Sequence, residues 1–201
     1  MKRIRLIAIL LLLYYPASAQ FSSTKIEFVN SVNGQSGNSI ACMFRDSRGF
    51  LWLATQNGLH RFDGKTTRTY KSIGENGLTD FNITAITEDR DHNIWIATEF
   101  GLNKLNPLTD KITHYYDGTG PGTIPYKWCN YLYVDRSGDL WLSTEKGIAL
   151  YDPQTNSFNN EPINIVGEDK KINRFITKMV EDSKGRFWLA TSYGIKLYDR
   201  T

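Results

Sequence analysis

The stretch DSRGFLWLATQNGLHRFD, from Asp46 to Asp63, has three further copies along the chain. They are DRDHNIWIATEFGLNKLN (89–106), DRSGDLWLSTEKGIALYD (135–152) and DSKGRFWLATSYGIKLYD (182–199). Each copy has one tryptophan, and the four tryptophans follow one another at intervals of 43, 46 and 47 residues. A period of this length indicates a repeat architecture, in which each copy forms one supersecondary unit.

Four positions recur in every copy: the tryptophan, an aspartate six residues before it, a threonine three after it and a glycine six after it. We expect the tryptophan to fill the space between neighbouring units. The aspartate is expected to accept hydrogen bonds from the backbone amides two and three residues on. The threonine hydroxyl can tie the next turn, and the glycine closes that turn with a positive φ. These roles are structural, so the recurring aspartates are not predicted to be catalytic.

Each repeat is predicted to form short strands separated by turns. In the first repeat the strands are Ser39–Arg45, Phe50–Thr55, Leu59–Phe62 and Lys65–Tyr70, because β-branched and aromatic residues lie between Gly, Asn and Asp turn signals. Four antiparallel strands, repeated in series, are typical of a β-propeller blade. The predicted fold is therefore all-β, with propeller blades at about 39–70, 82–116, 128–159 and 175–201.

Residues 1–20 are predicted to be a cleaved signal peptide. A basic Met1–Arg5 segment precedes a short apolar run, Leu6–Tyr15, and Ala17-Ser18-Ala19 matches the small-residue cleavage pattern. The apolar run is short for a membrane span, which needs about 20 residues. We therefore expect a periplasmic or secreted protein that does not insert into the membrane after cleavage.

The charge of the mature chain argues against nucleic-acid binding. Of 24 Lys and Arg residues, Lys2, Arg3 and Arg5 leave with the signal, so 24 − 3 = 21 basic residues remain beside 21 acidic ones. A nucleic-acid-binding protein needs an excess of positive charge. The two cysteines, Cys42 and Cys129, could pair in an oxidising compartment. We favour two unpaired, buried residues, because they lie two repeats apart.

The repeat resembles the two-component regulator propeller repeats of bacterial periplasmic sensors. The residues that carry the resemblance follow the pattern I-x-x-I/M-x-x-D-x-x-G-x-L/F-W-L-A/S-T-x-x-G-I/L-x-x-Y/F-D, here at 40–63, 129–152 and 176–199. The second copy departs from the pattern at His92, where the others have glycine, and at Asn106; the third copy begins with Cys129. The resemblance implies the extracytoplasmic input half of hybrid sensor kinases, many of which regulate polysaccharide use.

A count of strands does not decide whether the propeller closes into a ring. The first three repeats have a fourth strand, whereas the fourth repeat shows only three, and Thr24–Val29 is predicted to be a spare outer strand. In one interpretation this strand completes the blade of Trp188 and closes four blades into a ring. In the other, the repeats are part of a longer propeller. We favour the partial array, because the resemblance implies rings of about seven blades.

Ligand-binding residues are predicted where the copies differ, in the turns between second and third strands and in the loops before the first strands. Tyr126 and Trp128, at the end of the longest such loop, are predicted to stack on a sugar ring, with charged residues as polar partners. Alternatively, Trp128 fills the core of its blade. The full predicted set is Glu99, Phe100, Tyr126, Lys127, Trp128, Glu145, Lys146, Arg174 and Tyr193.

No catalytic, metal or cofactor site is predicted. The three histidines, His60, His92 and His114, do not have the spacing of metal ligands, so we expect solvent-exposed β residues. Asp89–Asn93 resembles the opening of a calcium loop but lacks its glycine and its distant glutamate. In sialidase-type propellers the repeated aspartate lies five residues before tryptophan, whereas here it lies six before. The sequence also nominates no carboxylate pair for glycoside hydrolysis.

The sequence thus predicts a ligand-sensing β-propeller module of two-component signalling, directed at a poly- or oligosaccharide and without kinase activity of its own. Its other expected partners are further propeller blades or a second copy. The first alternative is a stand-alone structural or protein-interaction propeller. The remote alternative is a polysaccharide-active lyase or hydrolase.

Overall fold

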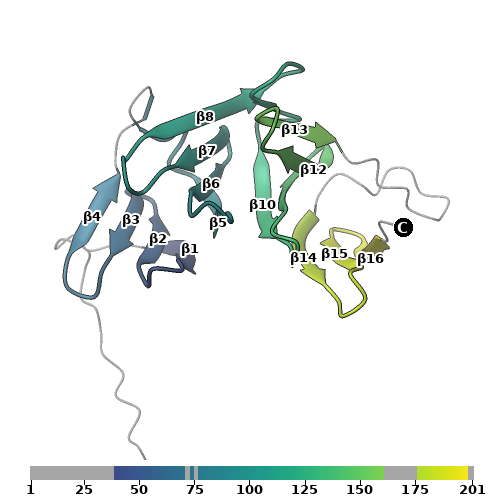
Figure 1. Ribbon diagram of the computed structural model, residues 1–201, viewed down its shortest axis with the longest axis horizontal. Helices are drawn as coiled ribbons and strands as arrows, with labels where there is room; N and C mark the ends of the chain where they lie inside the picture. The colour runs from purple at the N-terminus through teal and green to yellow at the C-terminus, as the bar shows by residue number, and fades with distance from the viewer. Residues whose placement is uncertain (1–38, 71–72, 75–76, 161–175, 199–201) are drawn as a thin grey trace, which may run out of the picture. The chain divides into compact units, whose positions relative to one another are not determined.

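The computed structural model describes residues 39–70, 73–74, 77–160 and 176–198 of the chain. These residues form strands and turns, without a helix among them. The strands make four separate sheets, and within each sheet the chain passes from one strand to its direct neighbour (Figure 1). We call the sheets blades 1 to 4, in chain order.

The strands of the four blades have the following bounds. Blade 1 contains β1 (Ile40–Arg45), β2 (Leu51–Thr55), β3 (Gly58–Phe62) and β4 (Thr67–Tyr70). Blade 2 contains β5 (Ile83–Glu88), β6 (Ile94–Thr98), β7 (Gly101–Leu105), β8 (Ile112–Asp117) and β9 (Thr123–Ile124). Blade 3 contains β10 (Cys129–Val134), β11 (Leu140–Thr144), β12 (Gly147–Asp152) and β13 (Ser157–Asn160). Blade 4 contains β14 (Ile176–Glu181), β15 (Phe187–Thr191) and β16 (Gly194–Tyr198).

These sheets confirm the predicted all-β propeller fold. The pairs within each repeat are antiparallel, with a bulge near the start of the first strand. The short strand β9, which pairs in parallel with the end of β8, was not predicted. Blade 4 has three strands in the part of the chain that the structure describes, and the predicted outer strand Thr24–Val29 lies outside that part.

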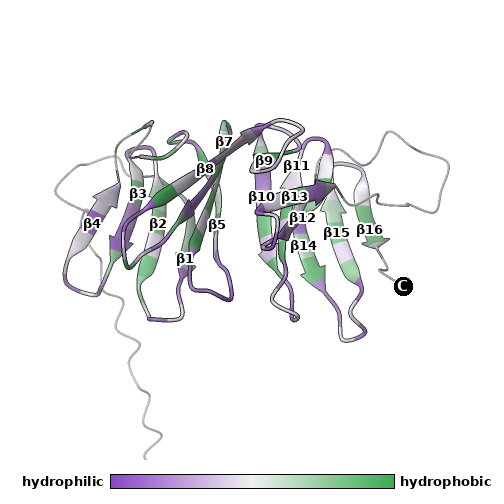
Figure 2. Cartoon of the chain, turned by 45° about the horizontal axis from the view of Figure 1, so that its top comes forward, coloured by the Kyte–Doolittle hydropathy of each residue, from purple (hydrophilic) through white to green (hydrophobic). Residues whose placement is uncertain are grey.

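Neighbouring blades pack together through the tryptophan of one blade and the first strand of the next. Figure 2 shows hydrophobic residues along the strands of all four blades. The second strands of blades 1 and 2, LWLAT and IWIAT, are apolar at successive positions, so both faces of these sheets carry apolar side chains. The side chains that share a hydrophobic cluster across the three junctions are Trp52 with Ile83 and Ile86, Trp95 with Cys129 and Leu132, and Trp141 with Ile176 and Met179. The predicted role of these three tryptophans is confirmed.

The recurring aspartate fastens the tryptophan to the turn that precedes it. Asp46 Oδ2 accepts a hydrogen bond from Trp52 Nε1 at 2.9 Å, and Asp46 Oδ1 accepts from the amides of Arg48 at 3.1 Å and Phe50 at 2.8 Å. The indole bond recurs in the other three copies. The prediction of amides two and three residues on is therefore wrong in its second part. The turn presents the amide four residues on, and the strand that follows returns the indole to the same carboxylate.

The recurring threonine and glycine have their predicted roles. Thr55 Oγ1 accepts from the amide of Asn57 at 3.1 Å and donates to the carbonyl of Gly58 at 3.3 Å, and equivalent bonds occur in blades 2, 3 and 4. Gly58 has φ of 107°, in the left-handed region, and its three counterparts have φ between 105° and 128°. The turn between the second and third strands is thus built alike in every blade.

Candidate functional site

Seven of the nine predicted ligand-binding residues lie on adjoining turns and loops of blades 2 and 3, a surface that we call the rim. It consists of Glu99, Phe100, Tyr126, Lys127, Trp128, Glu145 and Lys146. The amide of Gly101 donates to the carbonyl of Lys127 at 2.8 Å, which holds the loop before β10 against the turn between β6 and β7. Tyr193 lies in the corresponding turn of blade 4, and Arg174 lies outside the described residues.

Two aromatic rings of the rim each carry a lysine ammonium group. Lys127 Nζ lies 5.0 Å from the centroid of the Phe100 ring, and Lys146 Nζ lies 5.2 Å from the centroid of the Tyr126 ring. Such pairs are worth about 0.5–1 kcal/mol where they are exposed to water. A sugar that stacks on either ring therefore displaces an ammonium group at low cost, and the freed ammonium group can bind a hydroxyl or carboxylate of the same ligand.

The acidic side chain next to Phe100 is held in place by the loop before β5. Asn82 Nδ2 donates to Glu99 Oε2 at 3.0 Å, and the amide of Glu99 donates to the carbonyl of Asn82 at 3.2 Å. Glu99 thus has a fixed position beside an exposed aromatic ring. A carboxylate held in this way can accept hydrogen bonds from the hydroxyls of a ligand on that ring.

Trp128 lies on the surface rather than in the core of its blade. Its side chain is 36% exposed, and it belongs to none of the three hydrophobic clusters of the described residues, although the adjacent Cys129 is fully buried. The interpretation of Trp128 as a core residue is therefore wrong. The reason is the alternation of the chain, which turns Cys129 inward at the start of β10 and leaves the preceding indole outside.

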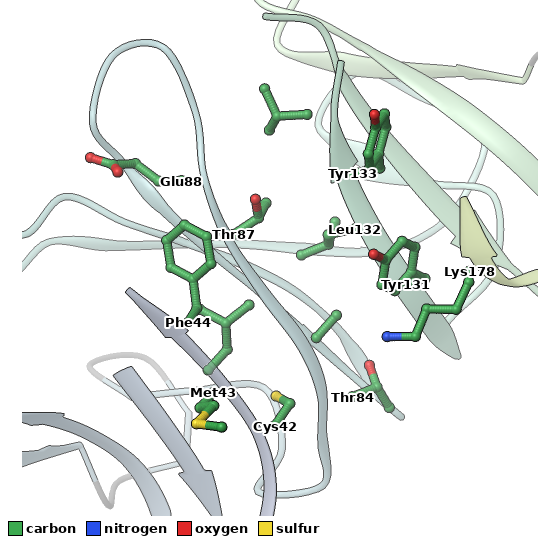
Figure 3. Close-up of a pocket in the computed structure, with 13 residues that line it drawn as sticks. Cys42, Met43, Phe44, Thr84, Thr87, Glu88, Tyr131, Leu132, Tyr133 and Lys178 are labelled. Carbon is green, nitrogen blue, oxygen red and sulfur yellow. The ribbon is translucent and has the colours of Figure 1, made fainter. Parts of the chain in front are cut away.

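The structure also contains a pocket of about 500 Å³ that sequence reasoning missed. It is lined by the first strands of the blades, with Thr84, Thr87 and Glu88 from β5, Tyr131 and Tyr133 from β10, and Lys178 from β14 (Figure 3). Lys178 extends its ammonium group into the pocket between Tyr131 and Thr84, and Lys178 Nζ lies 4.8 Å from the centroid of the Tyr131 ring. Polar and apolar side chains thus line the pocket together.

A signal for this pocket was present in the sequence. The residue ten positions before tryptophan is Cys42, Ala85, Tyr131 or Lys178, whereas the positions nine and twelve before tryptophan are apolar in every copy. Variation at one face of the first strand indicates a surface that is free of the common packing constraint.

The thiol of Cys42, which lines the pocket, is not activated as a nucleophile. Burial raises the pKa of Cys42 to about 11, although the charge of Lys178 acts in the opposite direction. Cys42 is therefore protonated at neutral pH, and a thiol is a far weaker nucleophile than a thiolate. Burial also raises the pKa of Cys129. Both cysteines are unpaired, as expected, and Cys129 is buried while Cys42 is half-buried.

A serine, a glutamate and a histidine meet between blades 1 and 2 but do not form a catalytic relay. Ser47 Oγ lies 2.6 Å from Glu88 Oε1 and 3.0 Å from His92 Nδ1, and the same Nδ1 lies 2.9 Å from Glu88 Oε1. A relay needs the serine and the acid on opposite nitrogens of the imidazole. Burial of Glu88 opposes its ionisation, but the hydrogen bonds from Ser47 and His92 hold the pKa of its carboxyl below the ordinary value. This group therefore joins two blades.

The other histidines also have local partners. His60 is buried, contrary to expectation, with Nε2 at 2.9 Å from Thr55 Oγ1 and Nδ1 at 3.0 Å from Thr69 Oγ1. His114 Nε2 lies 2.7 Å from the carbonyl of Gly77. Within the described ranges, no three His, Cys, Asp or Glu side chains gather in a way that could hold a metal ion. The same residues include no apolar helix of membrane-spanning length.

Comparison with known proteins finds a family match in three of the four repeats. The two-component regulator propeller family matches residues 34–57, 77–100 and 170–193, which fall on the first, second and fourth repeats. No curated protein sequence matches the chain.

Solved structures share the fold at low sequence identity. The extracellular domain of the hybrid two-component system BT3049 from B. thetaiotaomicron has a TM-score of 0.58 at 23% identity, over 83% of this chain and 29% of that one. The WD40 β-propeller domain of Doa1 has a TM-score of 0.58 at 9% identity, over 81% and 51% of the two chains. A catalytically inactive virginiamycin B lyase from Staphylococcus aureus has a TM-score of 0.54 at 15% identity, over 84% of this chain and 58% of that one. These likenesses establish the propeller fold, and the chain spans less than a third of the BT3049 domain.

Proposed function

We propose that this chain, three of whose repeats match the two-component regulator propeller family, is an extracytoplasmic input module that binds a poly- or oligosaccharide at the rim of blades 2 and 3. The extracellular two-component domain that shares its fold supports a place outside the cytoplasm. The signal-like N-terminal segment of the sequence favours the same compartment.

The observation that carries the proposal is the pairing of two aromatic rings, the exposed Phe100 and the half-buried Tyr126, with lysines on two adjacent blades. Phe100 and Lys127 form one pair, and Tyr126 and Lys146 form the other. Exposed aromatic rings beside charged side chains provide a stacking surface and hydrogen-bonding groups within one small area. A sugar presents an apolar ring face and hydroxyls at its edge, so the two kinds of group suit the same ligand.

In this proposal the chain binds its ligand and performs no kinase or glycan-cleaving chemistry. Signal output then depends on other parts of a two-component system, and the bound glycan is released unchanged. Chromatography of the glycan after prolonged incubation with the protein tests this point, with intact glycan as the expected result. Recovery of shorter, or unsaturated, products would instead favour the lyase or hydrolase alternative.

Binding is tested by calorimetric titration of the purified chain with a panel of neutral and uronate-containing oligosaccharides. We expect one class to bind, and Phe100→Ala and Lys127→Ala each to weaken that binding about ten-fold or more. Phe50→Ala is the matched control, because Phe50 also carries a cation, Arg61 at 4.8 Å, but precedes β2, away from the rim turns that follow the second strands. A folded chain that binds no member of the panel, or equal loss of binding in the control, contradicts the proposal.

A second candidate function is a propeller that binds protein and no small ligand. The observation that favours it is the set of exposed apolar side chains on blades 1 and 4, which includes Met43 and Ile195. A binding partner that is retained by the rim variants but lost on substitution of Met43 or Ile195 would support this candidate.

A further inference from the structure

The junctions between blades have two different sides. We define the leading face of a blade by the residues twelve and nine positions before its tryptophan, and the trailing face by the tryptophan and the residue seven positions after it. At each junction the trailing face of one blade packs on the leading face of the next. The junction is therefore heterologous, since its two halves are different surfaces.

The leading face of blade 1 is exposed although the same face is buried in every other blade. Ile40 is 51% exposed and Met43 is 70% exposed. Their counterparts in blades 2, 3 and 4 are at most 9% exposed: Ile83, Ile86, Cys129, Leu132, Ile176 and Met179. Met43 thus offers an apolar side chain at the position where each following blade receives its neighbour.

The trailing face of blade 4 is exposed in the same way. Trp188 is 43% exposed and Ile195 is 71% exposed, with Val180 and Leu197 also exposed beside them. Their counterparts in blades 1, 2 and 3 are at most 2% exposed: Trp52, Leu59, Trp95, Leu102, Trp141 and Ile148. The two uncovered faces are thus the two complementary halves of a junction that the chain already forms three times.

We infer that these faces bind a second copy of the chain head to tail, with the trailing face of blade 4 of one copy packed on the leading face of blade 1 of the other. The argument is continuity with the existing junctions, because the repeat places the same kinds of side chain at the same positions. Two such contacts join two copies, and twice the four blades that the described residues form reaches the upper end of the about four to eight blades usual for a propeller. The inference does not depend on the proposed ligand.

A polar feature of the junctions gives the contact a testable detail. At two of the three junctions, the residue five positions before tryptophan donates its amide to a glutamate seven positions before the next tryptophan, from Ser47 to Glu88 at 2.7 Å and from Arg136 to Glu181 at 2.9 Å. In the head-to-tail contact the corresponding pair is Ser183 and Arg45. Arginine cannot accept these hydrogen bonds, so the contact relies on its apolar part, and Arg45→Glu would supply the missing acceptor.

Sedimentation velocity of the purified chain over a range of concentrations tests the inference. We expect a reversible dimer, with the fluorescence of Trp188 shielded from acrylamide in the dimer. Met43→Asp and Ile195→Asp are each expected to weaken dimerisation by about 30-fold or more, the loss typical of a hot-spot side chain. Leu108→Asp is the matched control, because Leu108 is exposed in the turn between β7 and β8 and lies on neither face. Circular dichroism checks that each variant is folded.

Mixing the two variants separates head-to-tail contact from other modes. The Met43→Asp chain keeps its trailing face and the Ile195→Asp chain keeps its leading face, so the mixture is expected to form a heterodimer that neither variant forms alone. The Arg45→Glu variant is expected to dimerise several-fold more tightly than the wild type. A chain that stays monomeric with Trp188 shielded would show that the faces are covered within one chain. That result would overturn the inference. So would a dimer that Met43→Asp does not weaken, or assembly beyond two copies.

Discussion

At the scale of single residues, each blade is held to its first turn by one carboxylate. Asp89 Oδ2 accepts the indole hydrogen of Trp95 at 2.7 Å, and Asp89 Oδ1 accepts from the amides of Asp91 at 3.0 Å and Asn93 at 2.8 Å. The indole is fully buried, so water cannot replace the carboxylate there. The same bonds in blade 4 join Asp182 to Trp188, whose ring is partly in water.

Replacement of this aspartate should therefore cost more inside the array than at its exposed face. Asp89→Ala leaves the buried indole N–H and two amides without their acceptor, and we expect a loss of about 3 kcal/mol of unfolding free energy. Asp182→Ala should cause a clearly smaller loss, because water reaches Trp188. Urea denaturation of the two variants measures the difference, and equal losses would show that burial of the indole does not set the cost.

At the scale of elements, the turn between the third and fourth strands uses the same geometry with either aspartate or asparagine. Asp63 Oδ1 accepts from the amides of Lys65 at 2.8 Å and Thr66 at 2.6 Å. Asn106 Oδ1 accepts from the amides of Leu108 at 3.0 Å and Thr109 at 3.2 Å. The departure of the second repeat from the family pattern at Asn106 therefore preserves the turn.

The comparison of Asp63 with Asn106 leads to a prediction about how stability depends on pH. The amide and hydroxyl of Thr66, with the amide of Lys65, lower the pKa of Asp63 to about 2. A lowered pKa in the folded state gives stabilisation that is complete above the ordinary carboxyl pKa of about 4 and is lost as the pH falls toward about 2. Asp63→Asn should keep the turn but reduce the loss of stability across this interval.

Thermal unfolding of the wild type and Asp63→Asn between these two pH values checks the expectation. Asp152→Asn should act in the same direction, since hydrogen bonds from Thr155 and Gln154 lower the pKa of Asp152 as well. Parallel curves for all three proteins would contradict a contribution of these turns to the acid sensitivity of the fold.

At the scale of the whole molecule, equivalent side chains have unequal surroundings. Leu102 and Ile195 occupy the same position of the repeat, seven residues after tryptophan, yet Leu102 is buried against blade 3 and Ile195 is exposed. Both residues occupy the same place in the third strand of their blade. The difference arises because blade 3 covers Leu102, whereas no further blade among the described residues covers Ile195.

Truncation of these two side chains should separate local from inter-blade stabilisation. Leu102→Ala is expected to lower the unfolding free energy by about 3 kcal/mol, the cost of a cavity in a packed core. Ile195→Ala should lower it by less than about 1 kcal/mol, as for an exposed substitution, when the protein is dilute enough to be monomeric. Denaturant titration at low protein concentration gives both values, and a large loss for Ile195→Ala there would mean that its face is covered within a single chain.

The sequence by itself determined the repeat, the all-β propeller fold, and the roles of the recurring tryptophan, threonine and glycine. These features depend on spacing within about 20 residues, where strand alternation and turn chemistry act. It also indicated the turns and loops that make up the rim. Tertiary structure alone decided that lysines cover Phe100 and Tyr126, that Trp128 lies outside the core, and that the first strands line a pocket. These features depend on how loops, turns and first strands from separate parts of the chain pack together, which the pattern of a single repeat does not set.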